Sequence, residues 1–169
     1  ASNSGTYSAT VSQGDAVVND YSLSFDGQDD YTASQLYNQF NNTLSVSTWV
    51  KTSQIQSTGK LLYTGDYTNY STRNFGLHIS NNVIKFILSV SGIGEFYVES
   101  SYPSNLNDWH YISASYDNNN IKLYIDGNLV DTTPASGAIN NVNSLKFGTR
   151  DPLGQYLEGS LDGVEIWNT

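Results

Sequence analysis

The sequence has 169 residues, the length of one ordinary domain with a single hydrophobic core. Sixteen acidic residues against seven basic ones give a formal net charge of −9, so binding to a nucleic-acid backbone would act against the protein's own electrostatic field. The absence of cysteine excludes disulfides, thiolate metal sites and thiol nucleophiles. No segment approaches the ~18 consecutive apolar residues of a membrane span, so we expect no membrane insertion.

Apolar and small polar residues alternate with a period of two through most of the chain, which is typical of half-buried strands. In chain order, the expected strands are 23–25, 44–50, 60–63, 75–79, 83–90, 95–99, 111–116, 121–125, 145–148 and 163–167. No segment sustains the spacing of an amphipathic helix. Residues 1–20 have less pattern and are expected to be partly an edge strand and partly a lead-in, within one domain that spans 1–169.

Three short segments that follow expected strands predict tight turns. They are Asn81-Asn82, Asn118–Asn120 and Asp126-Gly127. Their residue types tolerate the positive φ angles that two-residue hairpin turns require. Many short strands joined in this way predict an all-β fold of two antiparallel sheets packed face to face.

Five segments in order carry a family resemblance: YSLSFDGQDDY at 21–31, LSVSTWVK at 44–51, WHYISASYD at 109–117, IKLYIDG at 121–127 and GSLDGVEIWN at 159–168. They resemble the successive signatures of the laminin G-like, concanavalin A-like jelly-roll domains. The resemblance implies a jelly-roll sandwich of the kind found as accessory modules in secreted carbohydrate-active and adhesive proteins. One departure is that Gly163 follows Asp162 where the family usually has a glutamate.

Catalytic motifs are missing from the sequence. Glycanases of the family that this sequence resembles place two carboxylates across the scissile bond, usually in a Glu-x-Asp-x-x-Glu pattern. This pattern does not occur here. Glu95 and Glu99 share one face of an expected strand and are the best available pair, although a solvated strand edge explains them more simply. His78 and His110 are interpreted as structural, and no Gly-x-Ser-x-Gly nucleophile elbow is present. We therefore expect a domain that is not an enzyme.

Residues 26–30 concentrate carboxylates and turn carbonyls, which are the oxygen donors that calcium prefers. The family resemblance implies that Asp26 and Asp162 lie near one another, because the first and last strands pair. The expected ligands of a structural calcium ion are Asp26, Gly27, Gln28, Asp30 and Asp162, with Asp29 as an alternative to Asp30. The same residues also fit a simple turn with a solvated cap, so both interpretations stay open.

Thirteen tyrosines are more than a small core needs, and aromatic rings beside short polar groups are typical of saccharide sites. Two polar loops of unusual length, 65–74 and 148–156, contain both arginines of the sequence. The expected ligand-binding residues are Asp66, Tyr67, Asn69, Tyr70, Arg73 and Asn74 in the first loop, with Arg150 and Tyr156 in the second. Pairing of either arginine with Asp66 or Asp151 inside the loops is an equally good explanation.

The three tryptophans are not expected to form the saccharide platform. Trp49 and Trp167 are interpreted as inward-facing, and Trp109 as packing in the core or at an edge. The sequence thus predicts a non-catalytic carbohydrate-binding module of a secreted or cell-surface protein, with a polysaccharide or other glycan and neighbouring domains of a larger chain as partners. An adhesion or spacer domain that contacts protein is the alternative, and a glycan-degrading enzyme is the third possibility.

Overall fold

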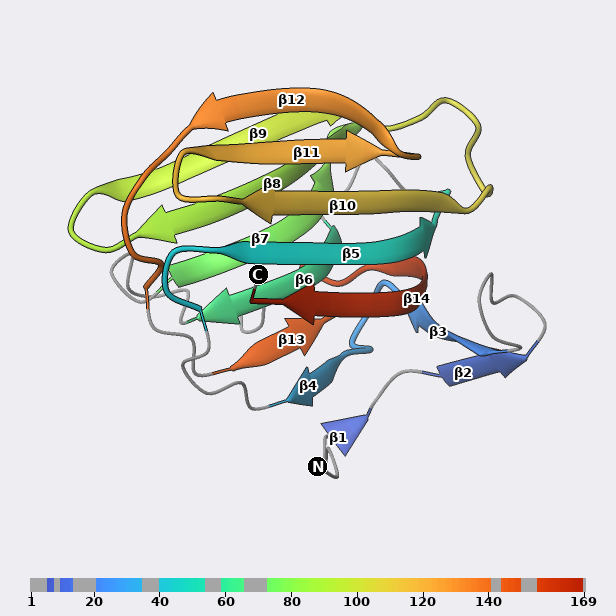
Figure 1. Cartoon of the computed structure of the whole chain (residues 1–169). Helices are drawn as coiled ribbons and strands as arrows, with labels where there is room; N and C mark the ends of the chain where they lie inside the picture. Colours follow the sequence, from blue (N-terminus) through green and yellow to red (C-terminus); the bar gives the residue numbers. More distant parts are fainter. Residues whose placement is uncertain are drawn as a thin grey trace.

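The structure, a computed structural model, describes residues 6–7, 10–13, 21–34, 40–53, 59–65, 73–140, 144–149 and 155–168 (Figure 1). These residues form strands, turns and connections, and no helix occurs within the described ranges. That part of the chain accordingly offers no helix long and apolar enough to cross a membrane. Its strands pair in two antiparallel seven-stranded sheets, so the predicted all-β fold is confirmed.

The first sheet lies behind the second in Figure 1 and ends at β9 on one edge. Its order is β1 (Thr6–Tyr7), β4 (Thr32–Ser34), β13 (Leu145–Phe147), β6 (Gly59–Gly65), β7 (Arg73–Ser80), β8 (Val83–Val90) and β9 (Gly94–Ser101). Three hairpin partners, β7, β8 and β9, therefore lie side by side in chain order, which brings their alternate residues into register.

The second sheet contains the first and last long strands of the described chain as neighbours. Its order is β12 (Asn128–Pro134), β11 (Asn120–Ile125), β10 (His110–Tyr116), β5 (Leu44–Lys51), β14 (Glu158–Trp167), β3 (Tyr21–Asp26) and β2 (Thr10–Gln13). The pairing of β3 with β14 is the pairing that the family resemblance implied. β1 and β2 take edge positions, one in each sheet.

The core lies between the two sheets and uses every second residue of their central strands. Fully buried members include Val46, Val50, Ile112 and Leu123 from the second sheet and Leu77, Ile84, Phe86 and Leu88 from the first. Since a slip of one residue would turn these side chains out to solvent, the core fixes the register of each strand. The register in turn fixes which residues face outward.

The predicted turns have the expected backbone conformation. Asn81 and Asn82 have φ of 51° and 64°, and Asp126 and Gly127 have 50° and 79°. Positive φ at both central residues is the requirement of a type I′ hairpin turn, whose twist matches that of the flanking strands. Asn118 adopts φ of 65° in the third predicted turn.

The edge strand β12 was not among the expected strands. It exposes residues on both faces, including Leu129 and Val130, so its sequence has no alternation to detect. The side chain of Asp131 on this strand accepts a 2.9 Å hydrogen bond from the backbone N–H of Glu99 on β9. This contact joins the exposed edges of the two sheets.

Candidate functional site

Outward-facing side chains of β6 to β9 form three parallel rows on the first sheet, and we call this surface the groove face. Successive strands contribute residues that are in register or next to a registered pair. The charged row contains Lys60, His78, Lys85 and Glu99. The middle row contains Tyr63, Gly76, Ile87 and Tyr97. The polar row contains Asn74, Ser89 and Glu95. With a spacing of about 4.8 Å between strands, the middle row extends about 14 Å from Tyr63 to Tyr97.

A small hollow of about 50 Å³ lies at the centre of the groove face, with lining residues from all three rows. Gly76 forms part of its floor, and a Cβ atom at this position would lie 3.0 Å from Cδ2 of Tyr63. The glycine therefore lets the Tyr63 ring lie across the strand, as expected for a glycine inside a strand where another group approaches closely. The hydroxyl of Ser89 lines the same hollow and has no hydrogen-bond partner among the described residues.

The groove continues in both directions along β8. Towards the turn between β7 and β8, a hollow of about 270 Å³ shares His78 with the central one. Towards the turn between β8 and β9, a hollow of about 440 Å³ shares Ser89 and Glu95. Because β8 has eight residues, the three hollows are distributed along about 26 Å of strand.

Tyr97 is the most exposed aromatic side chain on the groove face, with 53% of its surface accessible. The ammonium nitrogen of Lys85 lies 4.4 Å from the centroid of the Tyr97 ring and 2.5 Å from Oε2 of Glu99. The ion pair and the cation–π contact restrain one another at the surface. The Tyr97 ring is thus accessible to solvent yet held by its neighbours.

Five of the eight predicted saccharide-binding residues belong to the parts of the two loops that the structure does not describe. Asp66, Tyr67, Asn69, Tyr70 and Arg150 lie outside the described residues.

The other three residues of that prediction have described positions. Arg73 begins β7, where its backbone pairs with Gly65, and its side chain is outside the description. Asn74 is buried and lines the central hollow of the groove face. Tyr156 is half-buried beside Leu157, whose backbone N–H donates a 2.8 Å hydrogen bond to the carbonyl of Gly148. The predicted loop 65–74 therefore joins the groove face at its Asn74 end.

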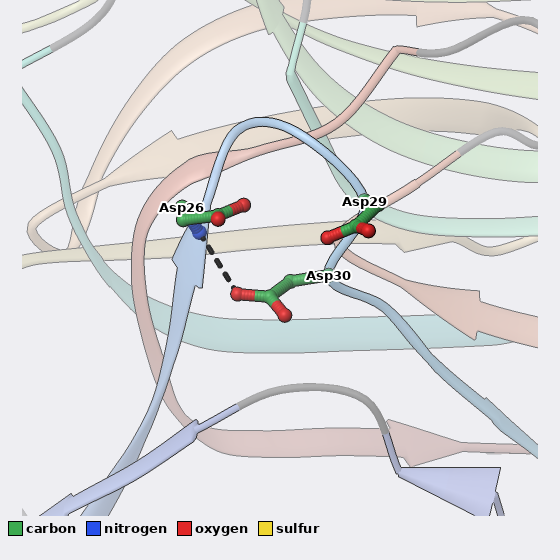
Figure 2. A group of neighbouring side chains, drawn as sticks. All are labelled: Asp26, Asp29 and Asp30. Atoms are coloured by element: carbon green, nitrogen blue, oxygen red, sulfur yellow. Dashed lines mark hydrogen bonds between the residues drawn. The ribbon is translucent and has the colours of Figure 1, made fainter.

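The acidic loop that follows β3 brings three carboxylates together (Figure 2). One oxygen from each of Asp26, Asp29 and Asp30 lies within 4.8 Å of the others. Oδ1 of Asp26 accepts a 2.8 Å hydrogen bond from the backbone N–H of Gln28, and the Gln28 amide donates to Oδ2 at 3.2 Å. Oδ2 of Asp30 accepts from the backbone N–H of Asp26 at 3.1 Å. Internal hydrogen bonds thus define the loop.

Asp162, the remaining predicted calcium ligand, lies elsewhere. In the register of β3 with β14, Asp26 is opposite Glu158, and Asp162 is four residues further along β14. Four residues of strand correspond to about 13 Å, so the structure does not bring Asp162 to the acidic loop. Glu158 takes that place, with Oε2 only 3.5 Å from the position of a Cβ on Gly27.

The interpretation of Trp49 and Trp167 as inward-facing residues is wrong. Trp49 alternates with the buried Val50 and lines a surface hollow, and Trp167 is 41% exposed. The error at Trp167 has a physical cause, because a bulge between Asp162 and Glu165 changes the alternation of β14. Trp109 is half-buried, with the Lys51 ammonium 5.9 Å from its ring centroid.

The two histidines differ in position. His110 is buried, and its Nδ1 lies 2.8 Å from Oδ2 of Asp126 in the turn between β11 and β12. Its ring packs edge-on against Tyr102, and burial together with the Asp126 charge raises the pKa of Tyr102 above the ordinary value. These contacts agree with a structural role for His110. His78, in contrast, lines the groove face.

Sequence reasoning missed the groove face because its residues come from four strands. Each strand alone shows only ordinary alternation, as in Lys85, Ile87 and Ser89. Gly76 was the available signal, since a glycine inside an expected strand marks a close approach of another group. A signal of this kind indicates the position but does not identify the residues that surround it.

A laminin G model described as the concanavalin A-like lectin/glucanases superfamily matches residues 25–169. The chain therefore belongs to this superfamily, and the predicted laminin G-like jelly-roll sandwich is confirmed. The description covers both lectins and glucanases, so membership establishes the fold without choosing between binding and hydrolysis. No curated protein matches the sequence.

Solved structures with the same fold include binding domains of botulinum neurotoxins. One is the serotype D ligand-binding domain in complex with N-acetylneuraminic acid, with 18% identity, a TM-score of 0.74, and coverage of 98% of this chain and 42% of that chain. Another is the serotype G binding domain, with 15% identity, a TM-score of 0.73, and coverage of 98% and 43%. The chain thus spans less than half the length of these structures, and the likeness concerns the fold.

Proposed function

We propose that the chain is a non-catalytic carbohydrate-binding module and that the groove face is its glycan-binding surface. The observation that carries the proposal is the middle row, in which the exposed Tyr97 and the half-buried Tyr63 ring, which lies over Gly76, flank Ile87. Sugars have flat faces of C–H groups that pack on aromatic rings. A floor between two tyrosines suits such a ring.

The charged and polar rows would supply hydrogen bonds to the sugar hydroxyls. The Glu95 carboxylate is an exposed acceptor and the half-buried Lys85 ammonium is a donor, whereas Asn74 and Ser89 line the central hollow but are buried. Because the hollows succeed one another along β8, they favour an extended chain over a single terminal sugar. The predicted loop 65–74 would add contacts at the Asn74 end.

The placement of the acidic residues supports binding over hydrolysis. Glu95 and Glu99 are four residues apart on β9, which corresponds to about 13 Å between their Cα atoms. Glycosidases hold their two carboxyl groups about 5 to 9.5 Å apart across the scissile bond, a separation that glutamates with Cα atoms about 13 Å apart reach only if both side chains bend toward each other. Glu99 is also engaged in the ion pair with Lys85.

The sialic acid complex of the serotype D neurotoxin domain shows that a protein containing this fold binds a sugar, and it is consistent with the proposal. A glycan target also favours a secreted or cell-surface location, with the module holding an attached enzyme or cell against a polysaccharide.

A calcium ion in the acidic loop is a separate proposal. Calcium binds oxygen ligands at about 2.3 to 2.6 Å, so oxygens that lie within 4.8 Å of each other can share one ion. Asp26, Asp29 and Asp30 would be the ligands, with Glu158 in the place expected for Asp162. A bound cation would offset the repulsion between these carboxylates and stabilise the end of β3.

Affinity electrophoresis against a polysaccharide panel tests the proposed glycan-binding surface. The panel contains galactomannan, xyloglucan, laminarin, polygalacturonate and hyaluronate. Tyr97→Ala should reduce retardation on at least one polysaccharide that the wild type recognises, and Tyr124→Ala, which changes a half-buried tyrosine on β11, should not. Absence of retardation on every glycan would favour the adhesion or spacer alternative. Equal effects of the two variants would refute the assignment of the groove face as the glycan-binding surface.

A further inference from the structure

The outer face of the second sheet carries a hollow of about 310 Å³ on the opposite side of the sandwich from the groove face. Its lining residues among those described are Trp49 on β5, Tyr111 on β10, and Gly163 and Glu165 on β14. These three strands are adjacent, so the hollow lies near the middle of the sheet.

A bulge in β14 builds the hollow. Asp162 pairs with Trp49 and Glu165 with Ser47, which leaves two residues of β14 opposite the single residue Thr48. The Thr48 hydroxyl donates a 3.1 Å hydrogen bond to the Asp162 carbonyl, and Oδ1 of Asp162 accepts one of 2.7 Å from the N–H of Gly163. The bulge is therefore held by specific contacts and is part of the fold.

Gly163 suits the backbone conformation of the bulge. Its φ of 54° lies in the left-handed region, where glycine carries no steric penalty. Gly163 lines the hollow without contributing a side chain.

The walls of the hollow are aromatic. The ring centroids of Trp49 and Tyr111 lie 5.2 Å apart with their planes tilted by 50°, and both side chains are half-buried. Partial burial restrains each ring while leaving part of it accessible. Such rings offer an apolar platform at little cost in side-chain entropy.

The charge of the hollow selects among saccharides. Glu165 is exposed and presents a carboxylate, which accepts hydrogen bonds from hydroxyls, and the Asp162 carboxylate lies in the same bulge. None of the described lining residues is basic. With a net charge of −9 on the whole chain, an acidic sugar would be repelled.

We propose that this hollow is a second saccharide site, specific for neutral sugars, with Trp49 and Tyr111 as the stacking platform and Glu165 as the acceptor of sugar hydroxyls. It is separate from the groove face and would make the module bivalent. Because the two sites face away from each other, they would bind two different chains, so one module could cross-link a polysaccharide.

The test measures binding of neutral and acidic glycans to four proteins by affinity electrophoresis and calorimetry. The proteins are the wild type, Tyr97→Ala, Tyr97→Ala with Tyr111→Ala, and Tyr97→Ala with Glu165→Gln. The probes are galactomannan, xyloglucan and laminarin as neutral glycans and polygalacturonate as an acidic one. Tyr97→Ala should retain affinity for at least one neutral glycan and none for polygalacturonate, and either second change should weaken that affinity at least fivefold.

Three outcomes would overturn the second site. Complete loss of glycan binding in Tyr97→Ala would contradict the second site and would still agree with glycan binding at the groove face. If both double variants bind as well as Tyr97→Ala, the remaining binding does not involve Tyr111 or Glu165. If Tyr97→Ala still binds polygalacturonate, the preference of the second site for neutral sugars is contradicted. Glu165→Gln changes an exposed residue and keeps the side-chain shape, so its result does not depend on whether Tyr111→Ala folds. Failure of every glycan to bind the wild type would instead count against the proposed function as a whole.

Discussion

Replacement of Gly76 by alanine should separate glycan binding from stability. The new Cβ would lie 3.0 Å from Cδ2 of Tyr63 and 3.5 Å from the carbonyl oxygen of Leu62, so the Tyr63 ring must move by a few tenths of an ångström. Overpacking of this kind costs about 1 kcal/mol. Because Gly76 has no left-handed φ, alanine also restricts the unfolded chain and recovers roughly 0.4 to 1 kcal/mol.

The two effects nearly cancel, so the melting temperature of Gly76→Ala should change by less than about 3 °C. The floor of the groove is raised and the ring beside it is displaced, and we expect the affinity for the recognised glycan to fall about tenfold, which is about 1.4 kcal/mol. Calorimetric titration measures the affinity, and thermal unfolding followed by circular dichroism measures the stability. Ser115→Ala, an outward change on β10 of the other sheet, is the control.

Unchanged affinity in Gly76→Ala, with the melting temperature also unchanged, would refute the assignment of the groove floor. A fall in affinity that matches the fall in the Ser115→Ala control would be equally damaging, because the loss would not be specific to the groove.

Three further predictions concern stability. If the acidic loop binds calcium, a calcium concentration one hundred times the dissociation constant should raise the free energy of unfolding by about 2.7 kcal/mol and the melting temperature by roughly 5 to 11 °C. Asp30→Asn should abolish this increase. If calcium added to metal-free protein does not change the melting temperature, the loop is only a turn. The backbone N–H groups of Asn120 and Asn119 hold the pKa of Asp117 below its ordinary value, so the stability that Asp117 contributes is present above about pH 4 and is lost as the pH falls through the lowered pKa. Acid titrations of unfolding should therefore be shallower in Asp117→Asn. Phe86→Ala removes a fully buried ring from the core and should cost about 3 to 5 kcal/mol in chemical denaturation, and a cost under 1 kcal/mol would contradict the packing described for β8.

The strands and turns could be predicted because their causes are local. Alternation marks one buried face, as in Ile121 to Ile125, and the Asn81-Asn82 and Asp126-Gly127 pairs supply the positive φ that hairpins need. The exposed edge strand β12 was not predicted, because it has no buried face and its sequence therefore shows no alternation.

The sites were harder to predict because they depend on register between strands. The resemblance correctly implied that the first and last strands pair, yet a register difference of four residues separates Asp162 from Asp26 and brings Glu158 in its place. A bulge that the alternation could not reveal turned Trp167 outward. The row from Tyr63 to Tyr97 crosses four strands, so no single stretch of sequence contains it.

Both proposed binding faces depend on the same core. Ile84, Phe86 and Leu88 face inward from β8, and this orientation holds Ile87 and its outward neighbours in fixed rows. On β5, the buried Val50 in the same way holds Trp49 outward. Exposed substitutions usually change stability by no more than about 0.5 kcal/mol, whereas core substitutions cost several times more. The exposed residues of either face, such as Tyr97 and Glu165, can therefore change with little effect on the fold. Since the two faces share no outward residue, the ligand preference of one can change without altering the other.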